Sequence, residues 1–158
     1  QHLSLASGVA LVSESYVRVE RGARIEHLQL GDGEESLQHG STYALVEQDA
    51  SYKNFFFNLS GTLHRRNLDL RLAASGANGE SYNLYLTNNK EHSDINTVIE
   101  HLQADTTSNQ LAKGILDGES KGIFTGKIHI HPQAQRVVSG QLNKNLLLSK
   151  KAQALSQP

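Results

Sequence analysis

The chain of 158 residues contains no cysteine, no methionine and no tryptophan, and it has only two prolines. Without cysteine, these residues form no disulfide, no thiolate-ligated zinc site, no thiolate-held cluster and no cysteine nucleophile. The same absence leaves the compartment open, because cytosolic and secreted proteins can both lack cysteine. Because the sequence begins at Gln1 and has no methionine, we expect it to be part of a longer protein that carries further functional residues.

Neither charge nor hydrophobic length points to nucleic acid or a membrane. Lysine and arginine number 15 against 16 acidic residues, a formal net charge of −1. Dedicated nucleic-acid binders are usually basic, so we expect no nucleic-acid partner. The longest aliphatic run is residues 9–12. A membrane helix needs roughly twenty apolar residues, and a signal peptide also needs a longer run than this one.

Apolar and polar residues alternate along much of the chain. The alternation is strict at residues 68–72 and 17–20, and weaker at 28–30, 83–86 and 128–130. A period of two places the apolar side chains on one face of a strand and the polar side chains on the other. The pattern therefore predicts an all-β chain of short strands, each about four to eight residues long.

Turn-forming residues separate the predicted strands. These signals lie at residues 31–33, 60–61, 75–79, 88–89, 117–118 and 139–140. Helical periodicity is scarce. The best helical candidate is residues 34–39, with Asp32 as its N-cap and Glu35 three positions later.

Two features favour a solenoid over the sandwich that short alternating strands also fit. Residues 22–28 and 49–55 contain similar phrases at a spacing of 27, which is near one coil of a β-helix. Asparagine and glutamine number 11 each, and such side chains stack in ladders inside β-helices. The repeat is weak, and the residue pattern alone leaves solenoid and sandwich both open.

Residues 118–122 (GESKG) match the G-x-S-x-G pattern of the α/β-hydrolase nucleophile elbow. That motif requires a strand-to-helix turn that lifts the serine above a parallel sheet. Here residues 123–128 are typical of a strand, and no β-α-β pattern surrounds them. We interpret the segment as a polar turn between strands.

His129 and His131 form an H-x-H pair, whose imidazoles project from the same face of a strand. Such a pair can chelate a metal, but a site needs one or two more ligands, and none is identifiable nearby in the sequence. Pro132 marks the end of the strand. We interpret the pair as outward polar residues.

The other histidines and carboxylates also lack visible chemistry. His64 and His92 have no second metal-ligand residue at a fixed, motif-like spacing in the sequence. Asp94 is a candidate acid–base partner for His92 or His101. No nucleophile accompanies them. The acidic residues of the chain, for example Asp69 and Glu100, look isolated. The sequence therefore predicts no catalytic, cofactor-binding or metal-binding residue.

Three surface features have ordinary explanations. The short basic segments are interspersed with acidic residues and indicate a solvated face; they are residues 65–66, residues 150–151, Arg18, Arg21 and Arg24. Residues 58–60 form an N-glycosylation sequon, which matters only in a secreted protein. Residues 55–57, three consecutive phenylalanines, interrupt the alternation, and we expect two of the rings to enter the core.

An ordered series of phrases resembles the SufB/SufD family of the SUF iron–sulfur cluster assembly system. The phrases are residues 94–97 with His101, 108–116, 122–128, 134–135 and 141–149. The resemblance covers most of the chain and is strongest from Leu63 onward. Within the family the chain is most similar to SufD, because SufB is expected to hold the nascent cluster or its sulfur through cysteine.

The resemblance implies that residues 1–158 form one domain, a right-handed parallel β-helix from the core of a longer cytoplasmic protein. Its N-terminal region and C-terminal helical part would lie outside this sequence. The implied function is a non-catalytic scaffold, without a cofactor in this segment, in a complex with SufB and the ATPase SufC. His129 and His131 match no family motif, so no functional residue is carried over. Unpaired strand edges at the ends predict a homodimer when the segment is isolated.

Three other functions remain as alternatives. The first is direct iron–sulfur or metal binding of the SufB type, against which the missing cysteine argues. The second is a β-helical polysaccharide-active enzyme, which needs paired carboxylates or a basic residue beside calcium ligands. The third is a secreted, adhesin-like solenoid.

Overall fold

The computed structural model describes residues 2–4, 8–33 and 35–157, and every regular element in them is a β-strand. The strands are β1 (His2–Ser4), β2 (Ala10–Val19), β3 (Arg24–Asp32), β4 (Leu37–Val46), β5 (Ser51–Asn58), β6 (Leu63–Leu72), β7 (Asn78–Thr87), β8 (His92–His101), β9 (Thr107–Leu116), β10 (Lys121–Ile130), β11 (Val138–Leu147) and β12 (Gln153–Gln157). No helix in this described part is long and apolar enough to cross a membrane.

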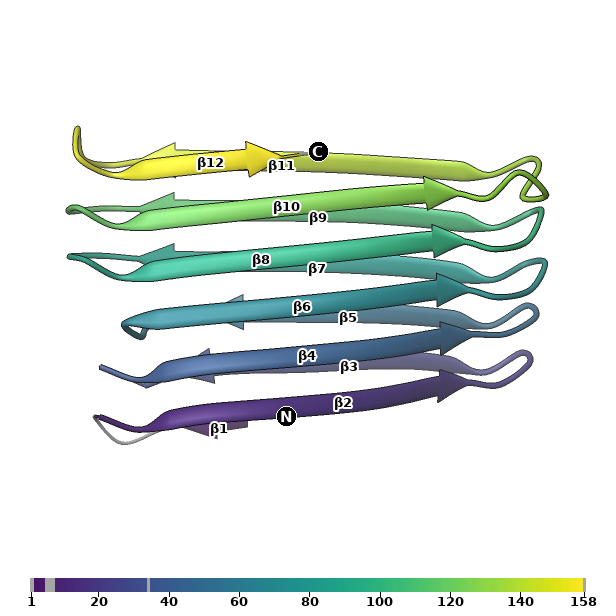
Figure 1. Ribbon diagram of the computed structural model, residues 1–158, viewed down its shortest axis with the longest axis horizontal. Helices are drawn as coiled ribbons and strands as arrows, with labels where there is room; N and C mark the ends of the chain where they lie inside the picture. Colours follow the sequence, from purple (N-terminus) through teal and green to yellow (C-terminus); the bar gives the residue numbers. More distant parts are fainter. Residues whose placement is uncertain (1, 5–7, 34, 158) are drawn as a thin grey trace.

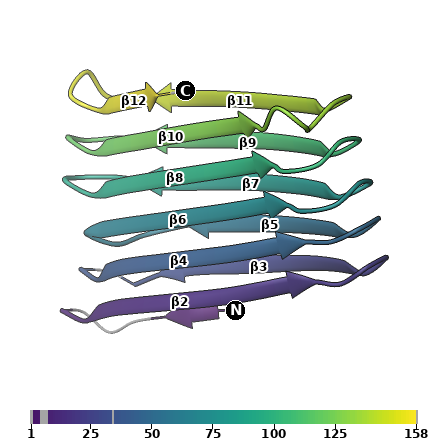
Figure 2. The same ribbon diagram turned by 45° about the vertical axis from the view of Figure 1, so that its right-hand side comes forward.

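Successive strands alternate between two facing sheets. Sheet A has the order β1-β3-β5-β7-β9-β11, and sheet B has the order β12-β10-β8-β6-β4-β2. Every pairing is parallel, which a sandwich built from hairpins does not give. Figures 1 and 2 show the chain rising one rung per pair of strands as a right-handed coil. The all-β, right-handed parallel β-helix is therefore confirmed.

The coil length explains why the sequence repeat is weak. Arg24 pairs with Ser51, which confirms the spacing of 27. The spacing is 26 where Leu37 pairs with Leu63, and it reaches 32 where Lys121 pairs with Gln153. Because the coils differ in length, similar sequence segments do not recur at a constant spacing along the chain.

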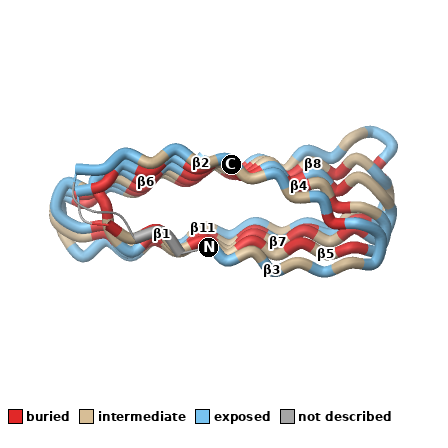
Figure 3. The backbone as a smooth tube through the Cα atoms, turned by 90° about the horizontal axis from the view of Figure 1, so that it is seen from below, coloured by how far each residue is buried: buried red, intermediate tan, exposed pale blue. Residues whose placement is uncertain are grey.

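Strict alternation of burial builds the interior. In β7 and β8 every second residue is buried, and Figure 3 shows the buried positions on the facing sides of the two layers. One apolar cluster surrounds Tyr52, Leu70 and Ile99, and a second surrounds Tyr85 and Phe124. Between the two clusters the interior is polar.

One residue of each coil adopts a left-handed backbone at the turn that leads from sheet B to sheet A. These residues are Gly22, Asp49, Gly76, Asp105 and Arg136, with φ between +56° and +76°. Their backbones form a ladder, in which Asp49 N–H donates to the Ser75 carbonyl and Gly76 N–H donates to the Asp105 carbonyl. The turn thereby keeps the coils in register at this end.

Three local predictions were wrong. Of the predicted helix 34–39, Glu34 lies outside the described residues, Glu35 has a left-handed φ of 54°, and strand β4 begins at Leu37. Most strands have ten residues, not four to eight, and β11 includes the predicted turn at 139–140. Coil-to-coil pairing outweighs these local signals, because each added coil supplies a complete row of backbone hydrogen bonds.

The three phenylalanines do not interrupt the alternation. Only Phe56 enters the core, where it is 1% exposed. Phe55 faces outward and stacks on Tyr82 of the next coil, with ring centroids 5.3 Å apart. The expectation of two core rings was therefore wrong, because position parity alone decides which ring points inward.

Candidate functional site

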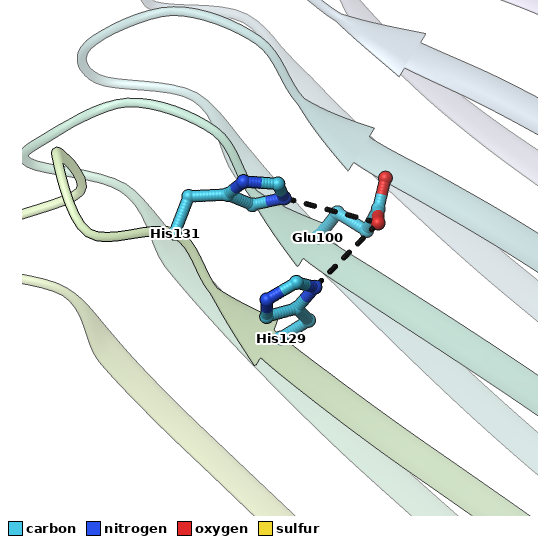
Figure 4. Close-up of side chains that lie close together, drawn as sticks. All are labelled: Glu100, His129 and His131. Carbon is cyan, nitrogen blue, oxygen red and sulfur yellow. Dashed lines mark ion pairs between the residues drawn. The ribbon is translucent and has the colours of Figure 1, made fainter.

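Glu100, His129 and His131 converge on the outer face of sheet B. Glu100 of β8 and His129 of β10 are direct register partners, and both point outward. His131 follows the end of β10, as Pro132 predicted, and its N–H still donates to the His101 carbonyl at 3.1 Å. Figure 4 shows both imidazoles turned toward the carboxylate.

The three side chains surround a small space without closing a hydrogen bond across it. Glu100 Oε1 lies 3.7 Å from His129 Nδ1 and 3.8 Å from His131 Nε2. Both distances exceed hydrogen-bond length. The two imidazole rings are stacked with centroids 4.3 Å apart. One potential ligand atom from each residue lies within 4.8 Å of the other two.

Arg71 of β6 occupies the other side of Glu100. Its Nε lies 3.3 Å from Glu100 Oε2, and its guanidinium also donates two hydrogen bonds of 3.1 Å to the Asp69 carboxylate. Asp69 and Glu100 are thus joined through one arginine, and the interpretation of both as isolated was wrong. The arginine engages Oε2 and leaves Oε1 directed at the histidines.

Glu100 could not be identified as a partner of His129 from the sequence, because 29 residues separate the two. The spacing of 27 seen early in the chain would have paired His129 with Leu102 instead. The only signal in the sequence is an outward carboxylate one coil before an H-x-H pair, and it becomes visible once the coil length is known.

Ser120 sits in the turn between β9 and β10, as predicted. It is fully buried, and its hydroxyl accepts a hydrogen bond from the Thr87 hydroxyl at 3.0 Å. Strand β10 follows directly, with no helix. The G-x-S-x-G segment is therefore a structural turn.

The acid–base candidates do not come together. Asp94 points outward and lies 3.6 Å from Arg65, whereas His101 points inward from the same strand. His101 is fully buried and bonds the Thr106 and Ser108 hydroxyls at 2.7 and 2.9 Å, and burial lowers its pKa. Asp94 and His101 therefore lie on opposite faces of β8. His92 shares the outward face with Asp94, but the Asp94 carboxylate is directed at Arg65.

The basic segments lie mostly on the exposed surface, as predicted. Arg18 pairs with Glu47 at 2.5 Å and Lys151 pairs with Glu119 at 2.5 Å. Arg66 is the exception, because it is only 8% exposed and lies inside the solenoid. Asn58 of the sequon is also buried, at 1% exposed, so the folded chain does not present it for glycosylation.

The buried Arg66 belongs to the polar middle of the interior. Its guanidinium carbon lies 5.0 Å from the Phe56 ring centroid, a cation–π distance. The cavity beside it, lined by Asn54 and Thr97 among others, has about 10 Å³ open to the centre of a water molecule. That is close to the least volume that holds one water.

The last coil leaves inward-facing apolar side chains uncovered. Leu147 is in register with the fully buried Leu116, yet it is 47% exposed. Ile130 is in register with the fully buried His101, and it is also 47% exposed. Within the described residues this end of the solenoid therefore shows open strand edges and apolar surface.

Together these features define a single-stranded parallel β-solenoid, in which the Thr106 and Ser108 hydroxyls that contact His101 are buried inside the coils. Comparison with known proteins gives its family. Residues 4–158 match the family model for "SUF system FeS cluster assembly, SufBD core domain", and the chain belongs to this family.

Several relatives are similar over nearly the whole chain. A SufBD family protein of Mycobacterium leprae is 28% identical over 148 residues, 89% of this chain and 38% of the relative. A SufBD family protein of Synechocystis is 28% identical, covering 94% of this chain and 32% of the relative. The SufD protein of Escherichia coli is 27% identical, covering 99% of this chain and 41% of the relative. The chain thus spans 32–41% of the length of these relatives.

Proposed function

We propose that this chain is the β-helix core of a SufD-like, non-catalytic scaffold subunit that works with SufB and SufC in cytoplasmic iron–sulfur cluster assembly. The observation that carries the proposal is the family match over residues 4–158 in a chain without cysteine. A member that holds a nascent cluster through thiolates needs cysteine, and this segment supplies none.

The solenoid's shape supports the scaffold role. Residues 1–158 act as one domain, whose stacked coils form a stiff body with long outer sheets and open edges at each end. Edge strands offer unpaired backbone groups to another chain. In the full-length protein these surfaces orient SufB and SufC, and ATP-driven movement of SufC strains the junction between SufB and this subunit.

Anaerobic reconstitution with ferrous iron and sulfide tests the scaffold against a SufB-like role. The full-length protein alone is expected to retain no acid-labile sulfide and no visible cluster absorption after desalting. A SufB-type homologue treated in parallel is the positive control. Stoichiometric sulfide retained by this protein would reject the scaffold assignment in favour of direct cluster binding.

The exposed last coil supports a second element of the proposal, self-association of the 158-residue chain as a homodimer. The open end combines the unpaired edges of β11 and β12 with apolar side chains such as Leu147. Size-exclusion chromatography with light scattering is expected to show twice the chain mass. A monomer at high protein concentration would contradict it.

A further inference from the structure

We propose that Glu100, His129 and His131 bind a divalent transition-metal cation, for which Zn²⁺ is the best match, on the outer face of sheet B. The inference is independent of the scaffold role, because it rests only on these three side chains and their surroundings. Two imidazole nitrogens and one carboxylate oxygen are a common protein ligand set for zinc, with a fourth position left for water.

The distances fit a site that closes by small side-chain rotations. In a tetrahedral zinc site with bonds of about 2.0–2.1 Å, ligand atoms are about 3.4 Å apart. The two nitrogens lie 3.7 and 3.8 Å from Glu100 Oε1, and the whole set lies within 4.8 Å. The two nitrogen-to-oxygen distances need to shorten by a few tenths of an ångström, and the nitrogen-to-nitrogen distance, which is at most 4.8 Å, by up to about 1.4 Å.

The backbone already holds the three residues in place. Glu100 and His129 are fixed opposite each other by the parallel ladder of β8 and β10. His131 is held by its backbone bond to His101 at 3.1 Å, which continues that ladder beyond the strand. A cation therefore has to order only side chains, and the cost of closing the site is small.

The cluster has an unsatisfied atom that a cation would satisfy. His131 Nε2 is buried from solvent and turned toward Glu100. It neither accepts nor donates a hydrogen bond among the described residues. A buried polar atom without a partner destabilises the fold. The His129 side chain is 47% exposed, so solvent and metal still reach the group from that side.

The neighbouring arginine determines which oxygen remains for the metal. Arg71 contacts Glu100 Oε2 at 3.3 Å, and Asp69 offsets its charge through two hydrogen bonds. Oε1 is the oxygen nearest both histidines, so the carboxylate would bind through one oxygen while Arg71 holds the other. Ligating carboxylates are commonly held by such outer partners.

The test is Zn²⁺ titration of the untagged, metal-stripped chain by calorimetry, with Co²⁺ absorption as a second readout. One ion per chain is expected, with visible Co²⁺ bands typical of four or five ligands. Glu100→Gln, His129→Ala and His131→Ala are each expected to weaken Zn²⁺ binding by more than about 100-fold, because losing even an outer partner costs 10–100-fold. Circular dichroism checks that each variant is folded.

His92→Ala is the matched control, since His92 is an outward histidine at the start of β8, remote from the cluster along the strand. It is expected to bind Zn²⁺ as the parent does. Absence of stoichiometric binding in the parent would overturn the proposal. So would equal losses in His92→Ala and His129→Ala, or unchanged affinity in the folded cluster variants.

Discussion

Arg66 on β6 reaches across Gly40 on β4 to the hydroxyl of Ser13 on β2, and the three residues form one register row. The Arg66 Nη1 donates to Ser13 Oγ at 3.5 Å. A Cβ atom at Gly40 would lie 1.6 Å from that nitrogen. The absence of a side chain at Gly40 therefore admits a buried cation to the interior and places it over Phe56.

Gly40→Ala is expected to destabilise the fold by about 1–3 kcal/mol, the range typical of overpacked cores. The added methyl forces the buried guanidinium away from Phe56 and Ser13. Urea unfolding measures the change. In an Arg66→Ala background the same substitution should lose most of its penalty. Equal penalties in both backgrounds, within the additivity limit of about 0.5 kcal/mol, would contradict the steric account.

His64 makes stability depend on pH. Burial, with a contribution from the Arg66 charge, lowers the pKa of His64 to about 4 from 6.5. The unfolded chain therefore takes up this proton first. The contribution of neutral His64 is complete above pH 6.5 and is lost as the pH falls from 6.5 to about 4, by at most about 1.4 kcal/mol per unit.

Urea unfolding between pH 4.5 and 7.5 checks this contribution. His64→Gln keeps a polar side chain without a titrating ring, so its stability should fall less steeply with decreasing pH. His92→Gln, at an outward position, should keep the steep slope of the parent. A His64→Gln profile parallel to that of the parent would show that His64 does not contribute to the pH dependence.

Substitutions at Gly22 and Gly118 distinguish the cost of a strained backbone from the cost of steric crowding. Gly118 has a φ of +63°, and a Cβ there would lie 2.7 Å from the Asn89 backbone nitrogen. Gly22 has a similar φ of +71°, but a Cβ there meets nothing within 4 Å. Gly22→Ala should cost about 1–2 kcal/mol from the left-handed backbone alone, and Gly118→Ala should cost clearly more. Thermal melts that rank the two equally would contradict the tight stacking of these turns.

The open end gives a prediction for self-association. Leu147→Asp should shift the isolated chain toward monomer without loss of β-structure. Leu147 points to the same inward side as Leu116, but no further described coil covers it. Leu142→Asp is the control on the outward face of the same strand. Light scattering reports the masses. A Leu147→Asp chain that dimerises as well as the parent would place the contact elsewhere.

The regular alternation of outward and inward positions predicted an all-β chain, whereas the choice of a β-helix over a sandwich came from the resemblance to the SufB/SufD family. The predicted strands were shorter than the observed ones where the inward positions are polar. In β6, His64 and Arg66 point inward, so the alternation was visible only from Leu68 onward although the strand begins at Leu63. Hydrophobicity does not distinguish an inward arginine from an outward one.

The histidine–glutamate cluster was beyond sequence reasoning for a different reason. Contacts between coils depend on coil length, which varies between 26 and 32 residues. The partner of His129 therefore cannot be counted from the chain, and only the observed register identifies Glu100. Local chemistry predicted the H-x-H pair, and the solenoid supplied the third side chain.

Co-purification of the full-length protein with the SufB-type and SufC-type proteins of the same genome tests the central claim most directly. After co-expression with an affinity tag on the SufC-type protein, native mass spectrometry should find all three subunits in one complex. Recovery of a SufB–SufC complex from which this protein is missing, under conditions where it is soluble and folded, would contradict its role as a scaffold subunit.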